Sequence, residues 1–356
     1  MKIINGLKSL IINKNELVLS NLHGLYIYDL ITESLKKIYN FKYTLRSIIS
    51  CLSRPLRRLL REDISLAILE DNENILYVKN KKITSLNILS STINYEIKLP
   101  RGSRPLNLLK IESNENFDKG IYFGEYFSNP EKNKVDVFKI ENGNLNSVFT
   151  FKENTINHIH NLVVDHNNNC IWILTGDFGS GAAIYQATDN FKTVKKIVGG
   201  LQKFRSCVAF PTNKGLLYAT DSQFEPNNNR ILHEQNNNWI DNNINKINGP
   251  CIYGTSVADK FYFSTSVEAI NTGNLFSKLV RNKRGPGIIK NQSEIVCVNS
   301  EGNISTVYEN KKDKLPYILF QFGNILFPNG TNNTNKLVFT PIALKSNDFD
   351  TIIMDL

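Results

Sequence analysis

The chain has 356 residues, of which 41% are apolar and 21% are charged, and it carries a formal net charge of +9 at pH 7. This composition is ordinary for a folded protein and excludes large-scale disorder. Polar residues break every apolar stretch well before the roughly 18 residues that cross a membrane, and residues 1–20 contain no apolar core of a signal peptide. We therefore expect a cytoplasmic protein. The basic charge favours anionic partners, unless the excess lysines serve only to solvate the surface.

Cysteine usage agrees with this location. The cysteines are odd in number, widely spaced and free of any CxxC motif, and they stand mostly in apolar runs: Cys51, Cys170, Cys207, Cys251 and Cys297. Such thiols are typical of buried reduced side chains, so we predict neither disulfides nor a zinc site.

Short runs of β-branched and aromatic residues alternate with turn residues along the whole chain, which is typical of an all-β fold. Residues 6–42 and 63–100 each divide into four such strands. Between them, the segment 43–62 combines apolar residues at helical spacing with several arginines, which predicts a basic helical insertion. This insertion either covers the edge of the neighbouring units or binds an acidic membrane or partner.

Residues 101–310 contain four clearer units, each of four strands within about 45 to 55 residues, the size of a β-propeller blade. The second strand of each unit ends on an acidic residue: Glu125, Asp177, Asp221 and Glu268. Composition alone does not explain this regularity, so we interpret the units as repeats. The segment 271–293 interrupts the fourth of these units and is predicted to be a long loop.

The C-terminal part provides three further strands, at 317–322, 336–340 and 351–355, and Met1–Ile4 can supply the fourth. The sequence thus predicts one domain over residues 1–356, an all-β, seven-bladed β-propeller of four-stranded antiparallel blades. Six blades are the alternative. Closing the ring between the N- and C-terminal strands removes sheet edges that would otherwise pair between chains.

Blade geometry predicts where polar residues gather. In an antiparallel blade the innermost strand begins on the face of the ring at which the second strand ends. Residues that precede first strands and residues that end second strands should therefore surround one mouth of the channel. The first group is Arg104, His158, His160, Gln202 and Arg205, and the second is Glu125, Tyr126, Asp177, Asp221 and Glu268.

We predict catalytic roles for His158, His160, Glu125, Tyr126, Asp177 and Asp221, and substrate binding by Arg104, Gln202, Arg205 and Glu268. The two histidines are two residues apart, which places both on one side of a strand, as a metal pair or as a base with its partner. The sequence indicates no definite cofactor beyond the option of a divalent metal there.

Each of these residues also has a purely structural interpretation. The histidines can be buried and hydrogen-bonded, and the strand-end acids can accept backbone N–H bonds in turns. Arg205 suits bidentate binding of a carboxylate, but it can equally form a salt bridge to Asp177 or Asp221. Nucleophile-elbow, P-loop, HExxH and RNP-like motifs are absent, so nucleotide and nucleic-acid binding are disfavoured.

The stretch from Gly120 to about Glu268 resembles the sialidase-like, BNR-repeat (glycosyl hydrolase-like) superfamily of β-propellers. The resemblance rests on FGEYF at 123–127, HIHN at 158–161, WILTGD at 172–177, QKFR at 202–205 and ATDS at 219–222, and on a degenerate Asp-box at 187–193. That box lacks its tryptophan, so the similarity is to the superfamily and not to true sialidases.

The resemblance implies that Arg104 and Arg205 bind a carboxylate and that Glu125 and Tyr126 are adjacent reactive groups. Histidine-bearing propellers also include polysaccharide lyases, in which His, Tyr and Arg act on the proton next to a uronic carboxylate. We therefore expect a glycoside hydrolase- or lyase-like enzyme that acts on an acidic glycan, or another small anionic ligand, at one channel mouth. The alternative is a non-catalytic propeller that binds a glycan or a protein in a surface-polysaccharide pathway.

Overall fold

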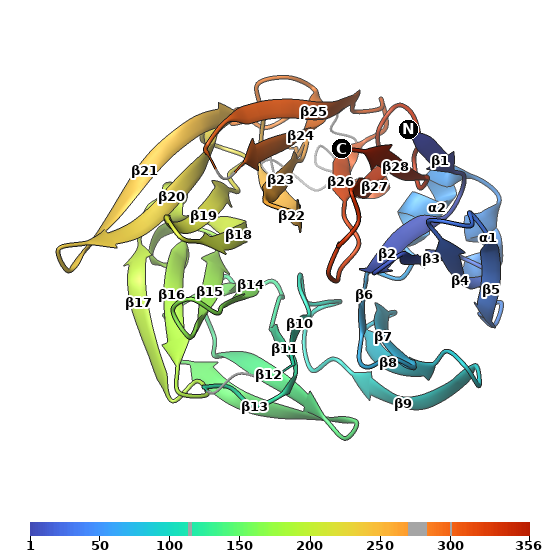
Figure 1. The fold of residues 1–356 in the computed structure, drawn as a ribbon, viewed down its shortest axis with the longest axis horizontal. Helices are drawn as coiled ribbons and strands as arrows, with labels where there is room; N and C mark the ends of the chain where they lie inside the picture. The colour runs from blue at the N-terminus through green and yellow to red at the C-terminus, as the bar shows by residue number, and fades with distance from the viewer. Residues whose placement is uncertain (113–115, 270–282, 300) are drawn as a thin grey trace.

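A computed structural model describes residues 1–112, 116–269, 283–299 and 301–356. They form seven four-stranded antiparallel sheets, arranged as blades around a central channel (Figure 1). The all-β propeller predicted from the repeats is confirmed, with seven blades and not six. Among the helices of the described ranges, none has the length and apolar character that crossing a membrane requires.

The first six blades follow the chain, and in each of them the first strand is innermost and the fourth is outermost. They are β2 (Lys8–Asn13), β3 (Glu16–Asn21), β4 (Gly24–Asp29) and β5 (Leu35–Asn40); β6 (Leu66–Leu69), β7 (Asn74–Lys79), β8 (Lys82–Asn87) and β9 (Thr92–Lys98); β10 (Leu109–Ile111), β11 (Gly120–Gly124), β12 (Val135–Glu141) and β13 (Asn144–Phe151); β14 (His158–Asp165), β15 (Cys170–Gly176), β16 (Ala183–Thr188) and β17 (Thr193–Gly199); β18 (Ser206–Thr212), β19 (Gly215–Thr220), β20 (Asn227–Gln235) and β21 (Asn238–Ile247); and β22 (Cys251–Val257), β23 (Lys260–Thr265), β24 (Gln292–Asn299) and β25 (Ile304–Lys311). Two single-turn 3-10 helices, η1 (Gly179–Gly181) and η2 (Gln202–Phe204), lie between strands of blades four and five.

Blade seven contains both ends of the chain. From the inside it consists of β26 (Asn324–Leu326), β27 (Lys336–Ile342), β28 (Thr351–Asp355) and β1 (Lys2–Ile4). The N-terminal strand β1 is outermost and pairs with β28, Ile3 lying opposite Ile352. The ring is therefore closed by the two terminal segments, as the sequence predicted.

One strand of that blade was predicted wrongly. Tyr317–Phe320 forms the short helix α4, and the inner strand begins only at Asn324. The run YILFQF at 317–322 is too short and too uniformly apolar for its periodicity to separate a helix from a buried strand. Pro316 directly precedes the helix, and a proline there favours the start of a helical turn.

The C-terminal boundary predicted for the loop at 271–293 is also wrong by two residues, because β24 begins at Gln292. Residues 283–291 contain no helix and no strand of the blades. The remainder of the predicted loop, residues 271–282, lies outside the described residues.

Residues 43–62 form a hairpin of two helices, α1 (Leu45–Cys51) and α2 (Arg54–Leu60). Thr44 caps the first helix in a capping box with Ser47, and Ser53 caps the second, whose first turn contains a proline. Most of the arginines fasten the hairpin to acidic residues of the same face, in the pairs Arg46–Glu62, Arg54–Asp350, Arg57–Asp63 and Arg58–Asp313. Their charge is thereby largely neutralised, which favours the interpretation of the insertion as a cover on the ring.

Neighbouring blades approach closely near the channel. Apolar side chains fill the space between sheets, and Trp172 of blade four packs with Leu216 and Tyr218 of blade five. At Gly124, which ends β11, an added Cβ would collide with the side chain of Ile159 in β14. A glycine is required there because the backbone of blade three lies directly on blade four, where the first candidate site residues stand.

Candidate functional site

A cavity of about 1040 Å³ occupies the central channel. It is bordered on one side by the α1–α2 hairpin and on the others by residues of the inner strands and of the loops beside them. Six of the ten predicted site residues line it: Arg104, Tyr126, His160, Arg205, Asp221 and Glu268. Because this volume is at the upper end of ordinary ligand sites, it has room for a ligand of several rings.

His158 and His160 begin the inner strand of blade four, and both are buried. The Nδ1 atom of His158 lies 3.1 Å from the carbonyl oxygen of Phe127, and that of His160 lies 3.0 Å from the carbonyl oxygen of Ser206. A carbonyl only accepts hydrogen bonds, so each Nδ1 carries the proton and donates it. In the neutral rings the two Nε2 atoms therefore present lone pairs, and these face each other at 3.0 Å.

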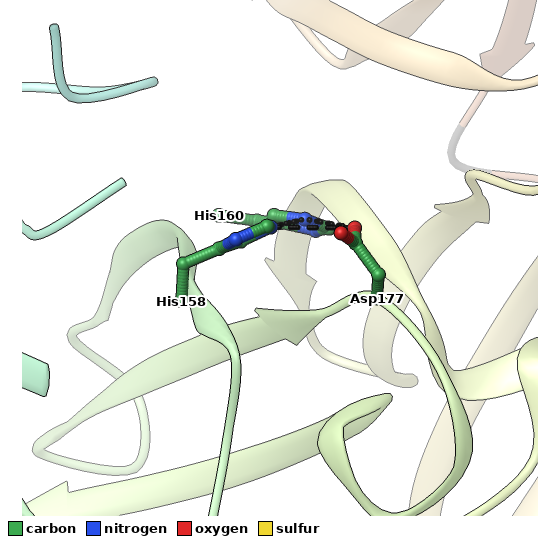
Figure 2. A group of neighbouring side chains, drawn as sticks. All are labelled: His158, His160 and Asp177. Carbon is green, nitrogen blue, oxygen red and sulfur yellow. Dashed lines mark hydrogen bonds and ion pairs between the residues drawn. The ribbon is translucent and has the colours of Figure 1, made fainter. Parts of the chain in front are cut away.

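Asp177, which directly follows β15, adds a third acceptor to the same place (Figure 2). Its Oδ1 atom lies 3.3 Å from Nε2 of His158 and 3.5 Å from Nε2 of His160. Burial opposes ionisation of Asp177, but its interactions with the two imidazoles and with Arg205 outweigh it and hold the pKa of this carboxyl well below its usual range. Burial lowers the pKa of His158, which favours its neutral form.

These three atoms fit a divalent cation. Tetrahedral zinc sites have bonds of about 2.0 to 2.2 Å to nitrogen and oxygen, which separates neighbouring ligand atoms by roughly 3.3 Å. The observed separations of 3.0, 3.3 and 3.5 Å match this spacing. Two imidazoles and one carboxylate leave coordination positions open for a ligand, as in catalytic metal sites. His158, His160 and Asp177 are thus the residues that would hold a metal.

Arg205 connects this cluster to a second carboxylate. Its guanidinium lies 3.3 Å from Asp177 and 3.3 Å from Asp221, so both salt bridges weighed from the sequence are present. Burial opposes its charge, but the two carboxylates raise the pKa of Arg205 above its usual value. Several buried polar atoms here still lack a hydrogen-bond partner among the described residues: Nη1 of Arg205, Oδ1 of Asp221 and Oε1 of Gln202. Such unsatisfied atoms indicate a position for a ligand or water.

A second group of metal-ligand types, His160, Cys207 and Asp221, lies nearby, with its ligand atoms within 4.8 Å of one another. It fits a metal less well. Burial and then the charge of Asp221 raise the pKa of the Cys207 thiol well above its usual value. The protonated thiol instead donates to Oδ2 of Asp221 at 3.3 Å.

Tyr126 and Glu268 complete the wall beside the histidines. The ring of Tyr126 packs edge-on against His158, with 4.4 Å between centroids, and burial raises the pKa of its hydroxyl above the usual value. Burial, and then the negative charge of Asp221, raise the pKa of Glu268 to about 7, while Ser266 donates a hydrogen bond to it at 2.9 Å. A carboxyl group of this kind can exchange a proton near neutral pH.

Arg104 and Gln202 occupy different positions. Arg104 precedes blade three, and its Nη2 atom lies 3.4 Å from the Tyr253 hydroxyl of blade six, so its side chain extends across the channel. Gln202 donates to the backbone carbonyl of Asp177 at 2.9 Å. It therefore supports the turn that presents Asp177, and it does not line the cavity.

Glu125 was predicted to be catalytic, but it lies outside the cavity wall. Its carboxylate is buried against Arg101 and accepts the backbone N–H of Asp136 at 2.9 Å. Glu125 therefore neutralises Arg101 at the strand end, which is the structural role that was the alternative for each acid.

Sequence reasoning missed Lys8, Arg61 and Tyr253, all of which line the cavity. The signal for Lys8 was available, because it begins the inner strand of blade one just as His158 begins that of blade four. Arg61 was grouped with the basic insertion, and no sequence rule separated it from the other arginines.

Replacing Gly176 with alanine should displace the His160 imidazole. An added Cβ at Gly176 would collide with Cε1 and Nε2 of that ring. We expect at least a tenfold loss of divalent-metal affinity with retention of the fold, measured by calorimetric titration and circular dichroism. Gly200→Ala is the control, since its added carbon meets no atom within 4 Å. Equal metal affinity in both variants would contradict the placement of His160.

No family model matches the chain, and no curated protein sequence matches it. Solved structures share its fold. An oligogalacturonate lyase in complex with manganese aligns with a TM-score of 0.55 and 9% identity, over 99% of this chain and 90% of that one. The oligogalacturonate lyase from Vibrio parahaemolyticus aligns at 0.54 and 10%, over 99% and 90%. The AfRom2 CNH domain aligns at 0.53 and 7%, over 99% and 94%. At these identities the likeness establishes the seven-bladed propeller and leaves the narrower sialidase-type assignment without support.

Proposed function

We propose that the channel cavity binds an acidic glycan and cleaves it next to a uronic carboxylate, with a divalent cation held by His158, His160 and Asp177. One observation carries this proposal: two imidazole Nε2 atoms and a carboxylate oxygen converge within 3.0 to 3.5 Å of one another, beside the buried Arg205. The manganese-bound lyase among the proteins of similar fold supports the same class of chemistry.

A bound divalent cation would supply Lewis acidity that withdraws electrons from the ligand's carboxylate. The protein's own residues have separate tasks. Arg104 extends into the cavity and binds the same carboxylate or its neighbour. Arg205 forms ion pairs with Asp177 and Asp221 and fixes the positions of both carboxylates. Gln202 holds the backbone at Asp177. Of the three residues that would hold the metal, His160 lines the cavity.

Cleavage by elimination needs one proton removed and one delivered. The carbon next to the carboxylate loses its proton to a base, a carbon–carbon double bond forms, and the glycosidic carbon–oxygen bond breaks with its oxygen taking up a proton. Glu268 lines the cavity and has a pKa of about 7, so it is the base that we assign. Tyr126 lines the same wall with its proton retained, and it is the group that we assign to protonate the leaving oxygen.

The test is an assay with oligogalacturonates and other uronate oligosaccharides in the presence of manganese. The elimination product is recognised by the ultraviolet absorbance of its new double bond, and hydrolysis by new reducing ends without that absorbance. We expect elimination by the wild type and a loss of at least a hundredfold in His160→Ala. His166→Ala is the matched control, because His166 is exposed on the turn of the same blade. Equal rates in both variants would overturn the assignment.

A non-catalytic binding propeller is the second candidate. It is favoured by the pairing of Arg205 with two carboxylates and of Glu125 with Arg101, which leaves fewer groups free for chemistry. Saturable glycan binding without any turnover in the same assay would decide for this candidate.

A further inference from the structure

The helical insertion has one arginine that its own anchoring does not use. Arg46, Arg54, Arg57 and Arg58 each form an ion pair, whereas within the described part of the chain Arg61 has none. Arg61 is the left-handed C-cap of α2, with φ of 55°. Its Nη2 atom donates to the carbonyl oxygen of Ile318 at 2.7 Å, and the side chain lines the cavity.

Lys8 is a second cation on the same wall, and it is almost completely buried, with 6% of its surface exposed. Its Nζ atom donates to the carbonyl oxygen of Ile64 at 2.7 Å. The carboxylate that influences it most, Asp63, is already bound by Arg57 through contacts of 2.6 to 3.1 Å. Lys8 thus has a backbone partner and, among the described residues, no ion pair of its own.

Arg104 is the third cation, and it too forms no ion pair with a described residue, its contact being the Tyr253 hydroxyl. Burial is the first cause that lowers the pKa of Lys8 and of Arg61, and the positive charge of Arg104 lowers both further. The charge of Arg104 is therefore close enough to act on both Lys8 and Arg61. Lys8 is buried, Arg104 is half-buried and Arg61 is exposed. The two carboxylates of the same wall, Glu62 and Asp63, are paired with Arg46 and Arg57. Cations that share a cavity without an ion pair of their own are expected where an anion binds.

Lys8 and Arg61 lie apart, in the ring, from the histidine cluster of His158, His160 and Asp177. Lys8 belongs to blade one, Arg61 lies between blades one and two, and Arg104 precedes blade three. The histidine cluster belongs to blade four, across the channel from blade one (Figure 1). Arg104 extends between the two groups, since its side chain reaches Tyr253 of blade six.

We propose that Lys8, Arg61 and Arg104 form a second anion subsite, so that the ligand carries at least two anionic groups, one at the histidine cluster and one near the helical insertion. This inference rests on the proposed function and narrows its substrate to oligomers of acidic sugars. The cavity of about 1040 Å³, larger than a single sugar needs, is consistent with a ligand that spans both groups.

Calorimetric titration with galacturonate, its dimer and its trimer, in the presence of manganese, tests the number of anionic groups. We expect the dimer or trimer to bind at least tenfold more tightly than the monomer. Arg61→Gln and Lys8→Met should each remove most of this advantage while leaving monomer affinity nearly unchanged. Arg54→Gln is the matched control, because it lies in the same helix but pairs with Asp350 outside the cavity wall. If both cavity variants bind every oligomer as the wild type does, the subsite is overturned.

A second set of probes separates this proposal from the proposed function. Citrate and inorganic phosphate are titrated into the wild type and the same variants, since a carboxylate and a phosphate share the chemistry that three cations recognise. If no uronate binds but either anion does, and Arg61→Gln and Lys8→Met abolish that binding, the subsite stands and the glycan assignment falls. If uronates are cleaved but these variants change neither oligomer preference nor anion binding, the proposed function stands and the subsite falls.

Discussion

Divalent manganese or zinc should raise the thermal midpoint of the wild-type chain by several degrees, and His160→Ala should abolish this increase. A metal that binds only the folded state adds about 2.7 kcal/mol to stability when its free concentration is about 100 times its Kd. The reason lies in the two Nε2 atoms, which face each other at 3.0 Å while both Nδ1 protons are donated to carbonyls. A bound cation would take up the Nε2 lone pairs of both neutral rings in two bonds. Calorimetric scans with and without metal measure the effect.

Two further variants test which side chains bind the metal. Asp177→Asn preserves the shape of the side chain but removes the charge, so it should weaken metal binding by at least tenfold. His166→Ala should behave as the wild type, because His166 is exposed at the opposite end of β14. If chelator-treated wild type and His160→Ala respond equally to added metal, the cluster does not bind the metal. The two imidazole Nε2 atoms would then share a proton in a hydrogen bond.

The architecture could be predicted because a propeller repeats its pattern. Each blade reproduces four short strands, and the acid after the second strand recurs at Asp177 and Asp221 just beyond β15 and β19. Such repetition predicts the fold even where individual strands are irregular. The segment at 317–322 shows the limit: it occurs once, it is uniformly apolar, and the helix that it forms is not distinguished from a strand by any period.

The site could be predicted only as a location. Blade geometry indicated which residues approach the channel, and six of them line its cavity. It could not indicate which acid has a local partner. Glu125 and Asp177 follow equivalent strands, yet Arg101 binds the first and the histidines meet the second. That difference depends on Arg101, which lies in a loop that carries no pattern of its own.

The sequence also did not predict that cations from distant segments line the same cavity. Lys8 and Arg61 are separated by two helices and three strands, and their common cavity follows from how the insertion folds back on the ring. A lysine at a strand start is ordinarily a surface residue. Only its burial, together with the absence of an ion pair among the described residues, distinguishes Lys8 from the many exposed lysines of the chain.

Replacing Lys8 with methionine should stabilise the protein at neutral pH by about 2 kcal/mol, although it removes a hydrogen bond. Burial, assisted by the charges of Arg104 and Arg57 and opposed by Asp63, lowers the pKa of Lys8 from its ordinary 10.5 to about 8. That difference corresponds to about 3 kcal/mol of destabilisation while the side chain is charged. Loss of the hydrogen bond to the carbonyl oxygen of Ile64 lowers the stability of the variant by about 1 kcal/mol, which reduces the net gain to about 2 kcal/mol. Urea denaturation at pH 7 measures the net gain.

The stabilisation expected for Lys8→Met depends on pH. The folded pKa lies below the unfolded one, so the unfolded chain binds more protons between about pH 8 and 10.5, and wild-type stability should rise through that window. Below about pH 8 the penalty is complete, and above 10.5 it is absent. The advantage of Lys8→Met should therefore shrink as the pH rises, whereas Lys36→Met, at an exposed position of β5, should show no such trend. A destabilised Lys8→Met at pH 7 would mean that this lysine contributes to folding. The expected gain would mean that the fold tolerates an unfavourable cation in its channel, as an anion-binding role requires.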